Sequence, residues 1–293
     1  MSGKIKIGAL VSGGGTNLQA VIDGCENGSI DGEMVFVGSD QDGIGGLERA
    51  RHHNIASFVV DYSAIIGAFR QGPDELEPPA DFDLADVQRK QGLFGPEADP
   101  RKVASFLITR AVAESRLLEN MKPYCADLLV LAGFMRNLTP YFIDRFMPHP
   151  DRPNILNIHP ALLPAFPGVD GYGDTFRYGC KVGGCTVHFI DYGEDSGPIV
   201  GQRAFAISDD DDLDAVRKKG LELEWALYPE CIQLYAKDRL QVVNMTHTLK
   251  NGRAVQKRVV KIAMENTLKV AHHHREGHKG SQGAPQIGKH HHQ

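Results

Sequence analysis

The sequence predicts an α/β fold built on a mostly parallel sheet. Two observations support this prediction: short apolar runs alternate with segments of helical periodicity, and glycine or proline breaks separate the two kinds of segment. Such alternation is typical of parallel strands joined by right-handed helical crossovers. The later strands follow one another more as hairpins, so the sheet is expected to be mixed.

The first part of the chain shows the alternation most clearly. A buried strand is expected at 5–11, because IKIGALV is apolar and the run stops at a glycine cluster. The following segment has apolar residues at helical spacing, with Thr16 or Asn17 as a possible cap. In this part we predict helices at 17–25 and 46–53, and further strands at 34–38 and 56–61.

The alternation breaks between 63 and 100. This excursion contains GPDELEPPADFD and LFGPEADP and is too long for an ordinary α/β loop, so we interpret it as a partly structured or mobile insertion. Beyond it we predict helices at 101–122, from Pro140 with Thr139 as its cap, and from Ser208 to about 235. The predicted strands are at 127–132, 154–158, 184–190, 198–207 and 239–244.

The element pattern suggests one main domain. Residues 1–245 are predicted to form it, with the excursion inserted at about 63–100. Residues 246–293 are interpreted as a C-terminal extension, partly disordered, because the chain turns basic and then rich in glycine, polar residues and histidine.

Composition excludes several classes of protein. With 42% hydrophobic and 24% charged residues, the chain has the profile of a soluble globular protein. Its net charge of -5 provides no general basic surface, so no nucleic-acid partner is expected, and no apolar run reaches the roughly 20 residues of a membrane span. Five cysteines without a CxxC pair, and no signal peptide, favour reduced thiols in a cytoplasmic protein. The histidine runs at 272–274 and 290–292 are not expected to form a functional metal site.

Four stretches near the ends of predicted elements could carry chemistry. SGGGTN at 12–17 could hold a phosphate at a helix N-terminus or be only a tight turn; it lacks a Walker lysine and the third glycine of a dinucleotide fingerprint. NIHPALLPAFPG places Asn157 and His159 on one side of an extended segment at a strand end. DYGEDSGPIV at 191–200 offers carboxylates that could reach His159, or an acidic turn in solvent. AGFMRNLTP at 132–140 suits a ligand, or simply ends a strand.

Together these stretches resemble the phosphoribosylglycinamide formyltransferases, a branch of the folate-dependent formyltransferase superfamily. The matching segments, in order, are SGGGTNLQAVID, GLERAR, LVLAGFMRNLTP, NILNIHPALLPAFPG, TVHFIDYGEDSGPIVGQ and LELEWALYPE. The resemblance implies an open, Rossmann-like sheet with helices on both faces. It also implies transfer of the formyl group of 10-formyltetrahydrofolate, a co-substrate, to the amine of glycinamide ribonucleotide in purine biosynthesis, with no metal required. The expected partners are small molecules, and a monomer or homodimer is expected.

The resemblance also implies residue roles. Asn157, His159 and Asp195 match the catalytic trio. Asn157 and protonated His159 would stabilise an oxyanion, and Asp195 is expected to keep His159 charged by raising its pKa. The positions that match the site for glycinamide ribonucleotide are Gly15, Thr16 and Asn17 for its phosphate and Glu224 for its ribose. The positions that match the folate site are Arg101, Met135, Arg136, Asn137, Leu138 and Asn157.

Departures from the family pattern keep further interpretations open. Ala161 replaces the usual serine, Asn137 replaces the usual isoleucine, and the excursion before Arg101 has no counterpart in short bacterial members. The chain could be a folate-dependent formyltransferase that acts on another amine, such as an amino sugar nucleotide. It could also be a non-catalytic folate- or nucleotide-binding protein, or a nucleotide-dependent oxidoreductase.

Overall fold

A seven-stranded sheet forms the centre of the computed structural model, which describes residues 3–72, 76–149 and 151–264. The strand order is β3-β2-β1-β4-β5-β6-β7. The first five strands in this order pair in parallel, and β6 and β7 add antiparallel. The predicted fold class, a mostly parallel and partly mixed sheet, is confirmed.

The predicted strands are found at or near their expected positions. The strands of the sheet are β1 (Ile5–Val11), β2 (Gly32–Ser39), β3 (Ser57–Val59), β4 (Leu128–Leu131), β5 (Ile155–His159), β6 (Val182–Phe189) and β7 (Ile199–Ala206). The α-helices are α1 (Thr16–Asn27), α2 (Gly45–His52), α3 (Tyr62–Gln71), α4 (Leu84–Lys90), α5 (Pro100–Met121), α6 (Pro140–Phe146), α7 (Gly171–Arg177) and α8 (Leu213–Ala236).

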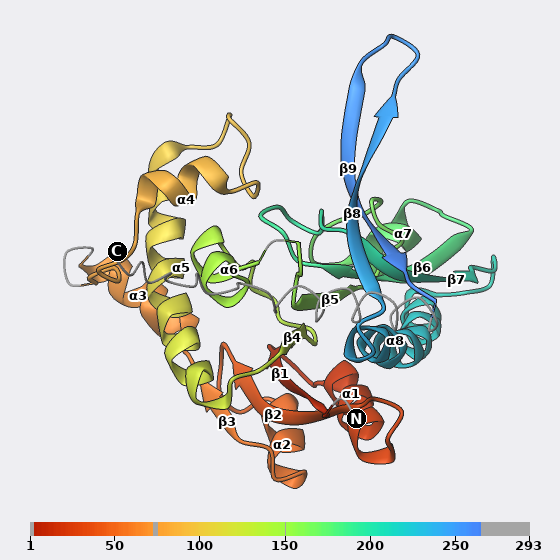
Figure 1. Ribbon diagram of the computed structural model, residues 1–293, viewed down its shortest axis with the longest axis horizontal. Helices are drawn as coiled ribbons and strands as arrows, with labels where there is room; N and C mark the ends of the chain where they lie inside the picture. Colours follow the sequence, from red (N-terminus) through yellow and green to blue (C-terminus); the bar gives the residue numbers. More distant parts are fainter. Residues whose placement is uncertain (1–2, 73–75, 150, 265–293) are drawn as a thin grey trace, which may run out of the picture.

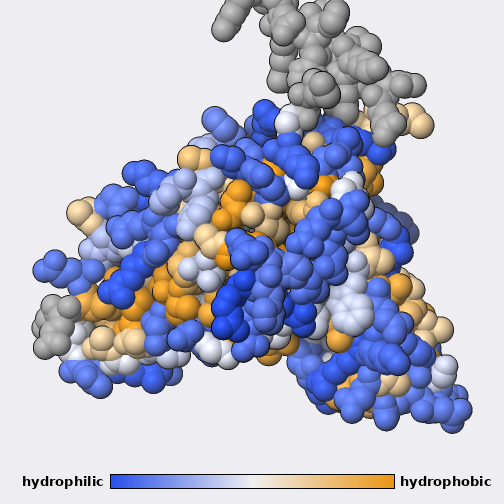
Figure 2. Space-filling view, turned by 90° about the horizontal axis from the view of Figure 1, so that it is seen from below, coloured by the Kyte–Doolittle hydropathy of each residue, from blue (hydrophilic) through white to orange (hydrophobic). Residues whose placement is uncertain are grey.

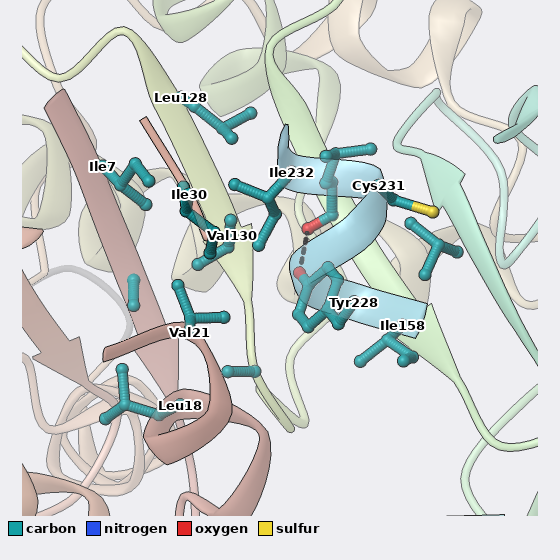
Figure 3. Packing of buried hydrophobic residues seen from close by; sticks show 14 of the residues in the cluster. Ile7, Leu18, Val21, Ile30, Leu128, Val130, Ile158, Tyr228, Cys231 and Ile232 are labelled. Carbon is teal, nitrogen blue, oxygen red and sulfur yellow. Dashed lines mark hydrogen bonds between the residues drawn. The ribbon is translucent and has the colours of Figure 1, made fainter. Parts of the chain in front are cut away.

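Two layers of helices cover the two faces of the sheet (Figure 1). Successive strand residues point to opposite faces, so Val130 packs toward α1 and α8, whereas Leu129 and Leu131 pack toward α3, α5 and α6. On the first face, Tyr228 of α8 is fully buried, and its hydroxyl lies 2.9 Å from the carbonyl oxygen of Leu156 (Figure 3). It also lies 3.0 Å from the carbonyl oxygen of Leu131. This side chain therefore ties α8 to β4 and β5.

Two helices, α1 and α8, have N-caps that differ from those predicted. Gly15 caps α1 in the left-handed region (φ 70) without a side-chain hydrogen bond, so the expected cap by Thr16 or Asn17 is wrong. A Cβ at position 15 would lie only 2.8 Å from the Cα of Gly46, and glycine has no Cβ to make this clash. Helix α8 begins after Asp212, whose carboxylate accepts from the N–H of Ala215, so the start predicted at Ser208 is too early.

The excursion contains helices of its own. Helix α3 lies in its first part, and α4 packs on α5 and α6 through an apolar cluster that includes Val87, Leu107 and Tyr141. Helix α7 was not predicted, because its sequence GYGDTFR is rich in glycine and too short for a clear period.

The first part of the predicted C-terminal extension continues a strand of the preceding segment. Strand β8 (Leu240–Thr248) pairs with β9 (Ala254–Ile262) in a hairpin that projects from the body (Figure 1). The domain boundary expected at 245 therefore falls inside a strand. The histidine runs at 272–274 and 290–292 lie outside the described residues.

Figure 2 shows a face on which polar residues predominate and apolar ones appear between them. Among the described residues, no helix is both long and apolar enough to cross a membrane.

Candidate functional site

A cavity of about 350 Å³ opens where β4 and β5 end at the carboxyl edge of the parallel sheet. Its walls come from the stretch after β4, the end of β5 with the loop that follows, the loop between β6 and β7, and α8. Nine of the residues singled out in the sequence line it: Asn17, Met135, Arg136, Asn137, Leu138, Asn157, His159, Asp195 and Glu224. The topology thus brings together segments that lie far apart in the chain.

His159 and Asp195 form the central contact of the cavity. Nδ1 of His159 lies 3.3 Å from Oδ2 of Asp195, and Nε2 lies 2.8 Å from the carbonyl oxygen of Phe166. Of the two alternatives for the 191–200 segment, the structure has the one in which a carboxylate reaches His159, because β5 and β6 are adjacent. The N–H of Gly168 also donates to Oδ2 of Asp195 at 2.8 Å, so two loops meet on one carboxylate.

The pKa of His159 goes against the sequence-based expectation. The side chain is only 3% exposed, and this burial lowers its pKa below the usual value, which the charge of Asp195 offsets only in part. Burial acts against the ionised form of Asp195 as well. The imidazole of His188 that faces it, the nearby His159 and the N–H of Gly168 nevertheless hold the pKa of Asp195 below its usual range. Asp195 thus favours the cationic form of His159, as expected, but the effect of burial is larger, so the pKa of His159 is lowered and not raised.

A second histidine belongs to the site and was not singled out in the sequence. His188 is fully buried on β6, directly opposite Asn157 in the antiparallel pair. Its Nε2 lies 3.2 Å from the amide nitrogen of Asn157 and 3.6 Å from Oδ1 of Asp195, and its Nδ1 lies 3.0 Å from the carbonyl oxygen of Phe189. A proton on Nδ1 satisfies that carbonyl, and Nε2 faces both the amide of Asn157 and the carboxylate of Asp195. Because His188 pairs with Asn157 across the two strands, the register of β5 against β6 is the signal that would have identified His188.

One end of the cavity is polar. Asn17 donates to one oxygen of Glu224 at 2.6 Å, and the hydroxyl of Tyr172 donates to the other at 2.5 Å. Burial raises the pKa of Glu224, and these two hydrogen bonds oppose that effect. Gly15 and Thr16 adjoin Asn17 in the chain but are not among the cavity-lining residues, and Thr16 faces a separate depression beside Arg49 and Trp225.

The other end is lined by the stretch after β4. Leu131, Phe134, Met135 and Leu138 give it an apolar surface. The amide of Asn137 reaches across to Oε1 of Glu194 at 3.3 Å.

Arg101 is not brought to this cavity. It lies exposed in the first turn of α5, where its N–H bonds the capping carboxylate of Asp99. Two cations flank the ring of Tyr62 instead: the Cζ of Arg136 lies 5.4 Å from its centre, and the Cζ of buried Arg110 lies 5.1 Å from it. Of these two arginines, Arg136 lines the cavity and Arg110 does not.

Within the described part of the chain, no group of three or more histidine, cysteine or acidic residues is arranged to hold a metal ion. The groups that the site offers are amide and imidazole donors beside a carboxylate. Donors of this kind suit stabilisation of an oxyanion in acyl transfer.

Comparison with known proteins shows which proteins the chain is similar to. A family profile described as formyl transferase matches residues 5–232. The phosphoribosylglycinamide formyltransferase of Haemophilus influenzae is 32% identical over 86% of this chain and 96% of its own length. The structure of glycinamide ribonucleotide transformylase 1 from Symbiobacterium toebii is similar with a TM-score of 0.65 and 33% identity, over 89% of this chain and 94% of that one.

Longer relatives contain a similar segment. The trifunctional purine biosynthetic protein adenosine-3 of Drosophila melanogaster is 31% identical over 78% of this chain. The chain spans only 14% of the length of that protein.

Proposed function

Because the chain belongs to the formyl transferase family, we propose that it transfers the formyl group of 10-formyltetrahydrofolate to the amine of glycinamide ribonucleotide. The products are formylglycinamide ribonucleotide and tetrahydrofolate, and the step belongs to purine biosynthesis. The observation that supports this proposal most strongly is the position of Asn157, His159 and Asp195 in one cavity with a polar end and an apolar end. Such a cavity suits a reaction between a phosphorylated sugar and a flat, largely apolar co-substrate.

The polar end suits glycinamide ribonucleotide. The carboxylate of Glu224, oriented by Asn17 and Tyr172, can accept hydrogen bonds from ribose hydroxyls. The glycine loop before α1 presents backbone N–H groups at a helix N-terminus, a setting that attracts phosphate. The apolar end beside Met135 and Leu138 is left for the folate ring system.

The reaction begins when the amine of glycinamide ribonucleotide attacks the formyl carbon on N10 of the folate. The formyl oxygen becomes negatively charged in the tetrahedral intermediate, and the amide of Asn157 and protonated His159 donate to it. Asp195 stabilises the cationic His159 and helps to relay the proton of the amine, through water, to N10. The bond from carbon to N10 then breaks, and tetrahydrofolate leaves.

His159 must give up one contact to act in this way. Both of its ring nitrogens face protein oxygens, Nδ1 toward Asp195 and Nε2 toward the carbonyl of Phe166. Phe166 has a left-handed backbone (φ 53), which is costly for a residue with a side chain. Replacing its carbonyl by the substrate oxygen would free Nε2–H for the oxyanion and allow this loop to relax.

An absorbance assay tests the proposal. Purified protein is mixed with 10-formyl-5,8-dideazafolate and glycinamide ribonucleotide, and deformylation is followed with and without the amine. We expect amine-dependent turnover that falls at least about 100-fold in His159→Ala, the range for loss of an oxyanion donor. The matched control His52→Ala removes an exposed histidine of α2 and should retain full activity. Folate binding without turnover on this amine would argue for another acceptor or for a binding protein.

A further inference from the structure

The excursion returns to the cavity through the short loop after α4. The N–H of Gly92 donates to the carbonyl oxygen of Tyr192 at 2.8 Å, and Gly92 forms an isolated parallel bridge with Gly193. Gly193 lies two residues before Asp195. The excursion is thus attached to the loop that carries the central carboxylate.

This attachment has a defined local structure. The side-chain oxygen of Gln91 accepts from the N–H groups of both Leu93 and Phe94 at 2.8 Å, which fixes the turn. A Cβ on Gly92 would lie 3.3 Å from the Cα of Gly193, so the two backbones lie close enough that a side chain at position 92 would press on Gly193.

A second tie runs through α6. Lys90 at the end of α4 pairs with Asp144 at 2.8 Å, and the hydroxyl of Tyr192 bonds the same carboxylate. Burial raises the pKa of the Tyr192 phenol to about 12, with the Asp144 carboxylate adding to the effect, so the phenol keeps its proton and remains a donor. The excursion, α6 and the loop after β6 are therefore linked by one acidic side chain.

Leu93 is the residue that the excursion contributes to the cavity wall. It is half-buried, and its neighbour Gly92 contacts Gly193, next to Glu194. Glu194 in turn contacts Asn137 of the apolar end. Leu93 therefore belongs to the side of the cavity where the loop between β6 and β7 meets Asn137 of the stretch after β4.

We propose that Leu93 is a specificity-determining residue of the folate subsite, held in place by the Gly92–Tyr192 contact. The proposal rests on the function proposed above and adds to it a wall supplied by the excursion. A branched apolar side chain on a mostly apolar wall excludes water from the face of a bound ring system. Its loss should weaken the folate and leave glycinamide ribonucleotide unaffected.

Binding and kinetics together test this role. Calorimetric titration with 10-formyl-5,8-dideazafolate should give a dissociation constant roughly three- to tenfold higher in Leu93→Ala, as expected for a partly buried apolar side chain. The KM for the folate should rise by the same factor, and the KM for glycinamide ribonucleotide should not change. Leu93→Trp, which adds bulk toward the cavity, should weaken the folate further, and Leu93→Met should restore binding.

The matched control is Leu84→Ala, a truncation in the same excursion at a residue that packs against the apolar cluster of Val87 and Leu107 and does not line the cavity. It should lower thermal stability at least as much as Leu93→Ala and leave folate binding unchanged. If wild-type protein binds the folate and both Leu93→Ala and Leu93→Trp bind it equally well, the role of Leu93 is refuted while the proposed function stands. If wild-type protein binds no folate, the proposed function fails, and the subsite fails with it.

Discussion

The substitution Asp195→Asn isolates the effect of one charge at the centre of the cavity. An asparagine has the shape of aspartate and keeps an oxygen that can accept from the N–H of Gly168, so the loop contact at 2.8 Å is preserved. What is lost is the negative charge 3.3 Å from Nδ1 of His159. Because that charge raises the pKa of His159 against the effect of burial, its removal lowers the pKa further.

The size of the effect follows from the separation of the two groups. Two unit charges 3.3 Å apart interact by about 5 kcal/mol at an effective dielectric constant of about 20. The asparagine dipole and water replace part of this interaction. We therefore expect kcat to fall roughly 100- to 1000-fold, with both KM values changed by less than about threefold.

The pH profile gives the sign of the effect. If the reaction requires cationic His159, activity declines as pH rises through its pKa, and this decline should move to lower pH in Asp195→Asn. The assay is kcat against pH, with the imidazole signals of His159 and His188 followed by NMR titration. Asp191→Asn is the control, because it removes a charge from the same loop where the carboxylate bonds Ser196 rather than His159. An unchanged titration of His159, or a decline that moves to higher pH, would refute the reasoning.

Three further outcomes can be measured. Glu224→Gln should raise the KM for glycinamide ribonucleotide roughly 10- to 100-fold in steady-state kinetics without changing the KM for the folate, since hydrogen bonds to a charged group are the strong ones. Burial raises the pKa of Glu114 from 4.5 to about 7. Between these pH values the folded state keeps a proton that the unfolded state releases, so the stability of the protein falls as pH rises. Glu114→Gln removes this loss and should raise Tm at pH 8 more than at pH 4. Tyr228→Phe should cost about 1–2 kcal/mol in urea unfolding. Tyr235→Phe, whose hydroxyl bonds a carbonyl in a more exposed place, should cost less.

The central strands of the sheet could be predicted from the sequence because they are apolar on both faces. Strands β1 and β4 are continuous buried runs between polar or glycine-rich breaks, and such runs leave few other possibilities. Helix α7 lacks this signal, and the start of α1 depends on the left-handed conformation of Gly15. The first part of β8 was predicted at 239–244, but its continuation to Thr248 and the pairing with β9 were missed because these segments are largely exposed and show no clear apolar alternation.

The candidate site was predictable where one motif supplies several groups. Asn157 and His159 lie two residues apart on one strand, so the period of a strand alone places them together. The pairing of Asn17 with Glu224 joins residues 207 positions apart, and only the resemblance to a known family linked them beforehand. Arg101 was placed by order in the chain, and the excursion ahead of it obscures the family register; in the structure it is exposed and does not line the cavity.

Burial of His159 has two opposite consequences for catalysis: it makes the imidazole a better hydrogen-bond donor, and it lowers the pKa of the ring. A His159 that is only 3% exposed offers its N–H to an oxyanion without competition from water, which makes the donor effective. The same burial lowers its pKa and makes the active cation scarcer. The charge on Asp195 offsets part of that cost, and this charge is maintained by His188 and by the N–H of Gly168. The catalytic state of His159 therefore depends on two loops that meet on one carboxylate, and a change in either loop should appear first in the pH dependence of kcat.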